Sequence, residues 1–120
     1  MSNMAGEIKD AVEDQEQLEL SCFQLVALVG NARSCYLEAI DLAEAGDFEA
    51  ARAKLDEGDA SFHEGHDAHM QLLTREANGE QLPFRIIVLH AEDQLMSAEA
   101  FRIIAERFIK VYETMNMEEE

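Results

Sequence analysis

The segment RIIVLHAEDQLMSAEAFRII, residues 85–104, decides whether the last third of the chain begins as a strand or as a helix. Its opening letters RIIVL are rich in β-branched residues and, taken alone, would suit a short strand. In a helix that turns about 100° per residue, however, Ile86, Phe101 and Ile104 align in one apolar stripe. The length of this stripe indicates a helix, which we predict from about Phe84 to Met115.

The same stripe carries polar residues in its middle, namely His90, Asp93, Gln94 and Ser97. A buried carboxylate without a partner is disfavoured by several kcal/mol. Because no Lys or Arg lies near Asp93 on the stripe, we expect His90, a metal ion or both to neutralise it. A core histidine bonded to a carboxylate is the structural alternative. A neutral histidine held in one tautomer is also a competent nucleophile toward phosphorus.

Two earlier segments also have helical periodicity, at residues 18–43 and 48–77. Between them, AGD (45–47) offers a glycine for a left-handed C-terminal position and an aspartate to cap the next helix. In NGEQLP (78–83), the Asn-Gly pair suits a turn and the proline suits the first turn of the third helix. We therefore predict an all-α protein, an antiparallel up-down-up three-helix bundle.

The ends of the chain differ from its middle in composition. Residues 1–16 are polar and acidic without a sustained apolar period, so we predict a frayed or disordered arm. Residues 17–115 are predicted to form the single domain, and residues 116–120 a solvated acidic tail. Around residues 86–96 the third helix is apolar on nearly every side, which two neighbouring helices cannot cover. We therefore expect an oligomer.

The charge of the chain restricts its partners. With 26 Asp and Glu against 9 Lys and Arg, binding to nucleic acid or to anionic lipid is disfavoured, and a basic protein partner is favoured. Cys22 and Cys35 lie in apolar helical patterns, which predicts buried, reduced thiols. We see no signal peptide and no apolar run of about 20 residues. We expect a cytoplasmic protein.

The segment HEGHDAH, residues 63–69, is the other candidate for chemistry. His66 and His69 are three residues apart on one helical face and could share a zinc ion. Alternatively, His63 is exposed and the other two fill the seam of the bundle. A di-iron site is disfavoured, because no histidine has a glutamate three residues before it.

Gly30, inside an apolar helix, is expected to permit close helix approach. Two functions stay open at this point: a phosphocarrier that uses His90, and a structural or metal-binding helical oligomer.

The sequences of several segments resemble those of a known protein family. LHAEDQLM (89–96) closely resembles the HAQDHLM segment of the lactose/cellobiose-type enzyme IIA, a family that includes chitobiose enzymes, of the phosphoenolpyruvate-dependent sugar phosphotransferase system (PTS). Other segments resemble the family's segments in the same order: GNARS (30–34), EAGDFEAA (44–51), EGH (64–66) and REANGEQLP (75–83). The resemblance covers about residues 18–114.

The resemblance implies a homotrimer of three-helix bundles that carries a phosphoryl group. The phosphocarrier protein HPr would donate the group to His90, which would pass it to a cysteine of enzyme IIB. Asp93 would bind metal, with three copies around one divalent cation per trimer, for which Mg²⁺ is suited. The membrane component, enzyme IIC, would determine the sugar, so lactose, cellobiose and N,N′-diacetylchitobiose all stay open. A histidine phosphotransfer module of a two-component relay is a rival, but no Lys-Gly follows any histidine in its H-x-x-K-G spacing.

The sequence departs from the family pattern at three positions near the expected site. Glu92 and His69 each replace a glutamine, and Gln94 replaces a histidine. His66 matches a family histidine and is expected to flank the site, with Gln94 and Glu92 as further supporting residues. We expect Glu92 to place a negative charge beside the phosphohistidine. The changes at His69 and Gln94 suggest an exchange of histidine and amide between neighbouring helices.

Overall fold

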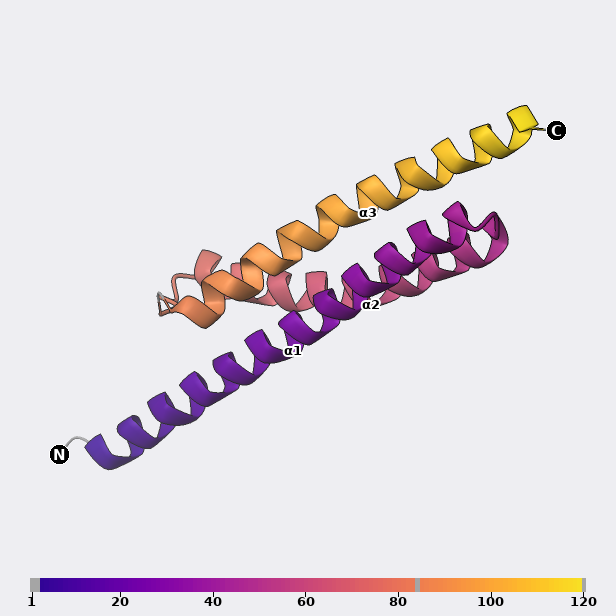
Figure 1. Ribbon diagram of the computed structural model, residues 1–120. Coiled ribbons are helices and arrows are strands. Elements are labelled where there is room, and N and C mark those ends of the chain that lie inside the picture. Colours follow the sequence, from indigo (N-terminus) through magenta and orange to yellow (C-terminus); the bar gives the residue numbers. More distant parts are fainter. Residues whose placement is uncertain (1–2, 84, 120) are drawn as a thin grey trace.

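Three long helices make up the chain. The computed structural model describes residues 3–83 and 85–119, and within them it contains α1 (Met4–Glu44), α2 (Phe48–Ala77) and α3 (Ile86–Glu119), without a strand. The molecule is elongated, at 81 × 20 × 19 Å, and α2 runs opposite to α1 and α3 (Figure 1). The predicted all-α, up-down-up bundle is confirmed. No described helix combines the length and the apolar character needed to cross a bilayer.

The turns form where the sequence predicts them. Gly46, at φ 86°, follows the end of α1, and the Asp47 carboxylate accepts a 3.2 Å hydrogen bond from the Ala50 N–H. Gly79, at φ 96°, likewise takes the left-handed conformation just after the end of α2. The start of α3 differs from the prediction, because the helix begins at Ile86 and Pro83 precedes it. The predicted start at Phe84 lies outside the described residues.

The core lies around α1, which packs against both other helices, whereas α2 and α3 contact each other much less. Tyr36, Leu25 and Val29 of α1 are fully buried. Phe23 of α1 is apolar but 61% exposed. From α3 the core receives Ala91, Leu95, Ala98, Ala105 and Ile109. The three alanines bring α3 close to α1 along its length.

The apolar stripe predicted as the inner face of α3 is therefore not the core of the single chain. Ile86 is 85% exposed, and Ile104 and Phe108 are also exposed. The helix has two apolar faces, one of small residues and one of large residues. Reasoning from periodicity selected the large residues, but the alanine-rich face is the one that packs inside. The prediction that His90 and Asp93 interrupt a buried face is wrong for one chain.

Close helix approach depends on two glycines of α2. A Cβ at Gly58 would lie 2.7 Å from Cε1 of Tyr36, and one at Gly65 would lie 2.9 Å from Cγ1 of Val29. Gly30, to which the sequence assigned this role, has no atom within 4 Å of such a Cβ. α2 thus approaches α1 through its own glycines.

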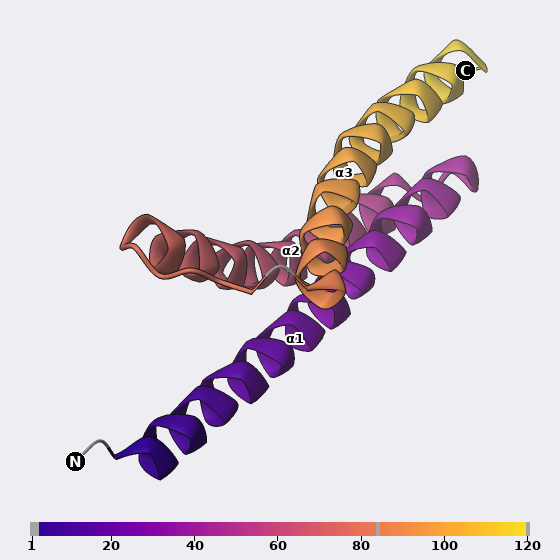
Figure 2. The same ribbon diagram turned by 90° about the vertical axis from the view of Figure 1, so that its left-hand side faces the viewer.

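Residues 4–16 differ from the predicted disordered arm, because they are helical and continuous with α1. This segment projects beyond the other helices at the N-terminal end (Figure 2). The Asn3 side chain accepts a 3.3 Å hydrogen bond from the Gly6 N–H, and Arg75 of α2 lies 3.2 Å from the Asp14 carboxylate. A cap and this ion pair favour helix where core contacts are few. At the other end, α3 continues through residues 116–118, which are exposed.

Candidate functional site

His90 and Asp93 are both exposed on α3, one turn apart. Asp93 lies among the exposed apolar residues of the helix, between Leu89 and Met96 in sequence. These positions recur at the spacing of three and four residues that defines one helical face. The imidazole of His90 is thus open to an approaching molecule, and Asp93 lies on a face that the single chain leaves uncovered.

Gln94 lies one turn after His90 on α3, and a residue of α1 donates a hydrogen bond to its side chain. Nη1 of Arg33 donates a 2.7 Å hydrogen bond to Oε1 of Gln94. The two residues are 61 positions apart in sequence, so only the packing of α1 against α3 brings them together. Sequence reasoning did not select Arg33. The signal available for it was the segment GNARS, which contains it.

Glu92 lies on a different side of α3. Two residues after His90, it is about 200° around the helix from it. Its Oε2 lies against Nδ1 of His69 on α2. That nitrogen is buried and makes no hydrogen bond to any group among the described residues, so its contact with Glu92 is one of close charge proximity. The expectation that Glu92 places its charge beside His90 is therefore wrong, because the carboxylate turns toward α2.

The histidines of α2 gather on the Glu92 side. The ring of His66 lies 6.2 Å from that of Phe62 and 6.1 Å from that of His69, between ring centroids, and both His66 and His63 are exposed. The predicted exchange between His69 and Gln94 is wrong, since His69 contacts Glu92 and Gln94 contacts Arg33. His66 is exposed on α2 beside Phe62 and His69, and the hydrogen bond that holds Gln94 comes from α1.

No group of three or more His, Cys, Asp or Glu residues suited to a metal ion occurs among the residues that the structure describes. HEGHDAH thus gives no such cluster within one chain. Asp93 is a single exposed carboxylate on an uncovered apolar face. A hard cation prefers several carboxylate or water oxygens, so Asp93 fits such an ion only where other copies of the chain contribute theirs.

An apolar cleft of about 340 Å³ lies between the end of α2 and the start of α3. Leu72, Pro83, Val88 and Glu92 are among its lining residues, and His90 is not. The cleft is therefore on the Glu92 side of the bundle. The surface at His90 suits the approach of a macromolecule more than the enclosure of a small ligand.

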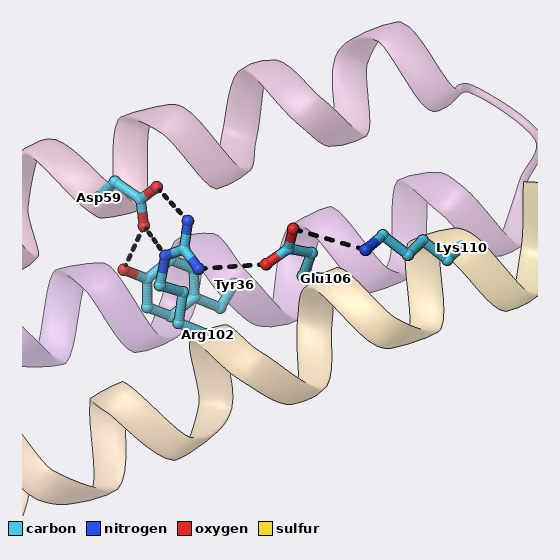
Figure 3. A network of polar contacts seen from close by, with 5 residues as sticks. All are labelled: Tyr36, Asp59, Arg102, Glu106 and Lys110. Atoms are coloured by element: carbon cyan, nitrogen blue, oxygen red, sulfur yellow. Dashed lines mark hydrogen bonds and ion pairs between the residues drawn. The ribbon is translucent and has the colours of Figure 1, made fainter.

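Other ionisable groups of the core are structural. Burial raises the pKa of both thiols, Cys22 and Cys35, which are free and poor nucleophiles as neutral thiols. The Tyr36 hydroxyl donates a 2.8 Å hydrogen bond to Asp59, and Arg102 pairs with the same carboxylate at 2.8 and 3.1 Å (Figure 3). Burial, followed by this hydrogen bond, raises the pKa of Tyr36 well above its ordinary value. The network joins all three helices, and Arg102 lies about three turns beyond His90 along α3.

Comparison with known proteins identifies the family. The sequence matches the family described as "PTS system, Lactose/Cellobiose specific IIA subunit" over residues 20–113. The chain belongs to this family. The lactose-specific EIIA component of the PTS from Staphylococcus aureus is 34% identical to it over 99 residues, which are 82% of this chain and 96% of that protein.

Solved IIA structures share the fold. The cellobiose-specific enzyme IIA from Bacillus anthracis superposes with a TM-score of 0.80 at 31% identity, covering 82% of this chain and 90% of that one. The IIA component in a IIA(chitobiose)–HPr complex superposes with a TM-score of 0.74 at 26% identity, covering 82% and 96%. The part of the IIA chain outside the family match includes the projecting start of α1.

Proposed function

We propose that this IIA protein is a phosphoryl carrier of a sugar-uptake PTS, which accepts phosphate from phospho-HPr on His90 and passes it to a cysteine of enzyme IIB. The observation that carries the proposal is the exposed His90 imidazole on α3 in a chain of this family. The similarity to an IIA–HPr complex supports HPr as the donor. The acidic surface, at a formal charge of −17, favours encounter with a basic donor.

The chemistry requires two transfers of one group. In the first, Nε2 of neutral His90 attacks the phosphorus of the donor; a new P–N bond forms as the donor's bond to phosphorus breaks, and that electron pair stays on the donor. In the second, the IIB thiolate attacks, a P–S bond forms, and the electron pair of the P–N bond returns to Nε2. Both pass through a loose state in which the protein mainly positions groups and offsets charge. An exposed imidazole suits this task, because two different partners must reach it.

The exposed face of α3 supports assembly as a homotrimer. Its apolar residues include Met96, which is 69% exposed, and Ile103, and they follow the spacing of a helix that packs on copies of itself. In a trimer, Asp93 of each chain would meet at the axis and hold one divalent cation, with Mg²⁺ suited to carboxylate oxygens. The cation would offset the three charges that assembly buries.

We place the protein in the cytoplasm, where it would work with the membrane component, enzyme IIC. The relatives act in systems named for different sugars, including lactose and cellobiose. Because IIA exchanges phosphate with proteins only, we assign the choice of sugar to enzyme IIC.

Phosphoryl uptake tests the proposal. The protein is incubated with phosphoenolpyruvate, enzyme I and HPr, and its intact mass is measured over time. We expect the wild type and the control His63→Gln, at an exposed histidine of α2, to gain one phosphoryl group, and His90→Gln to gain none while keeping its helicity. Uptake by His90→Gln would refute the assignment of the residue. Absence of uptake by the wild type, or uptake only from a sensor kinase, would refute the carrier function.

A further inference from the structure

Arg33 differs from almost every other cation of the chain. All Lys and Arg residues except Arg33 and Arg107 lie within ion-pair distance of a carboxylate among the described residues. Arg33 is half-buried and bonds instead to the neutral amide of Gln94, at 2.7 Å. In a chain with 26 acidic residues and 9 basic ones, an arginine held by an amide keeps its charge for another anion.

The position of Arg33 relates it to His90. Gln94 is one turn after His90, about 40° around α3, so the two side chains share one side of the helix. Helical side chains lean toward the N-terminus of their helix, which directs Gln94 toward His90. The guanidinium that donates to Gln94 is thereby held at the side of α3 that also carries His90. Glu92, on the α2 side of the helix, does not compete for it.

The chemistry of a phosphoryl group on His90 requires such a cation. The group carries close to two negative charges, and the loose transfer state spreads them over its three peripheral oxygens. A guanidinium has five N–H donors in a planar fork that matches two phosphate oxygens. The bond to Gln94 uses one of these donors and fixes the orientation of the others.

We propose that Arg33 is a further catalytic residue of the phosphoryl-transfer site, whose guanidinium, oriented by Gln94, binds the phosphoryl oxygens on His90. This inference rests on the proposed carrier function. Arg33 supplies the positive charge, and Gln94 acts as its positioning residue. A carboxylate at position 94 would instead bind the guanidinium and neutralise it.

The test measures the rate of phosphoryl uptake at saturating phospho-HPr and the HPr concentration that gives half the maximal rate. Arg33→Gln is expected to lower the saturated rate by about 10²-fold, the loss typical of removing one preorganised donor to an anionic transition state. Arg33→Lys keeps the charge but not the fork, so we expect a smaller loss. Gln94→Glu, which keeps Arg33, is expected to slow uptake as well. Arg52→Gln removes the same charge at an exposed ion pair and should leave the rate unchanged.

The outcomes separate the two proposals. A wild type that gains no phosphate refutes the carrier function and this inference with it. A wild type that gains phosphate, with Arg33→Gln equally fast, refutes the inference alone. The inference is also refuted if Arg33→Gln raises only the half-saturating HPr concentration, because that result assigns Arg33 to docking. Circular dichroism of each variant confirms that the helices and their melting are retained.

Discussion

Nδ1 of His69 on α2 lies against the carboxylate of Glu92 on α3, with both side chains largely buried. Both residues replace glutamines of the family pattern, so two departures that are far apart in sequence meet at one contact. Where the resemblance leads us to expect a pair of amides, this chain has an imidazole and a carboxylate in close contact. The replacement therefore acts on the α2–α3 seam, and Glu92 does not face His90.

This contact predicts that the two residues are energetically coupled. Glu92→Gln or His69→Gln alone should lower the free energy of unfolding by about 1–3 kcal/mol, because each leaves a buried polar group with a changed partner. The double variant, with the glutamines of the family, should recover part of the loss. We expect a coupling energy of about 0.5–3 kcal/mol in the cycle measured by urea denaturation. Additive losses would show that the contact contributes nothing.

The glycines of the bundle predict opposite effects of the same substitution. Gly58→Ala places a Cβ 2.7 Å from the ring of buried Tyr36, and we expect a loss of about 1–3 kcal/mol in unfolding free energy. Gly30→Ala adds a Cβ in open space and gains helix propensity, so it should stabilise the chain by up to about 1 kcal/mol. Denaturant midpoints measure both. Equal effects of the two variants would contradict the packing.

The hydroxyl of Tyr36 predicts a loss of stability at alkaline pH. Burial and the bond to Asp59 raise its pKa above the ordinary 10.0, so the folded protein keeps the phenol protonated where the unfolded chain ionises. The resulting stabilisation is complete below pH 10.0 and is lost as the pH rises toward the folded-state pKa.

Tyr36→Phe tests this statement. The variant lacks a hydrogen bond to a carboxylate and should lose about 1.5–3 kcal/mol at neutral pH. Between about pH 9 and about pH 11 its unfolding free energy should fall less steeply than that of the wild type. Both proteins keep the two thiols, so the difference between them reports Tyr36 together with its interaction with Cys35. Parallel pH profiles would contradict the assignment of the raised pKa to Tyr36.

The helices and turns could be predicted from the sequence because their signals are local. The positive φ of Gly46 and the cap by Asp47 depend on residues within one turn. Which face of α3 packs inside could not be predicted, since the helix has two apolar faces. Only packing against α1 determines that the face with the alanines is buried. In residues 4–16 the apolar side chains Met4, Ile8 and Val12 are exposed. The interactions of this helical segment include a cap by Asn3 and an ion pair with Arg75, which is remote in sequence.

Sequence reasoning selected His90 and Asp93 as candidate site residues, but it could not predict their surroundings. The spacing of residues within one helix determines which side chains share a face of that helix. It does not give which neighbour meets that face, so the partners of Gln94 and Glu92 were assigned incorrectly. Arg33 was missed for the same reason: nothing near it in sequence relates it to α3.

The uncovered face of α3 predicts that a single charge will disrupt assembly. Met96→Lys places an ammonium on the exposed apolar face, where three copies would meet, and we expect the trimer to dissociate in sedimentation velocity. Ile8→Lys adds the same charge at an exposed apolar residue of the projecting part of α1 and serves as the matched control. A monomeric wild type, or an intact trimer of Met96→Lys, would show that this face is not the interface.

The carboxylate of Asp93 predicts a separate effect on the bound cation. Asp93→Leu should keep the trimer and abolish its bound divalent cation in elemental analysis. The stability of the variant in chelator should increase by about 1–4 kcal/mol, because an apolar residue replaces a buried charge. Unchanged metal content in Asp93→Leu would remove the carboxylate from the cation site.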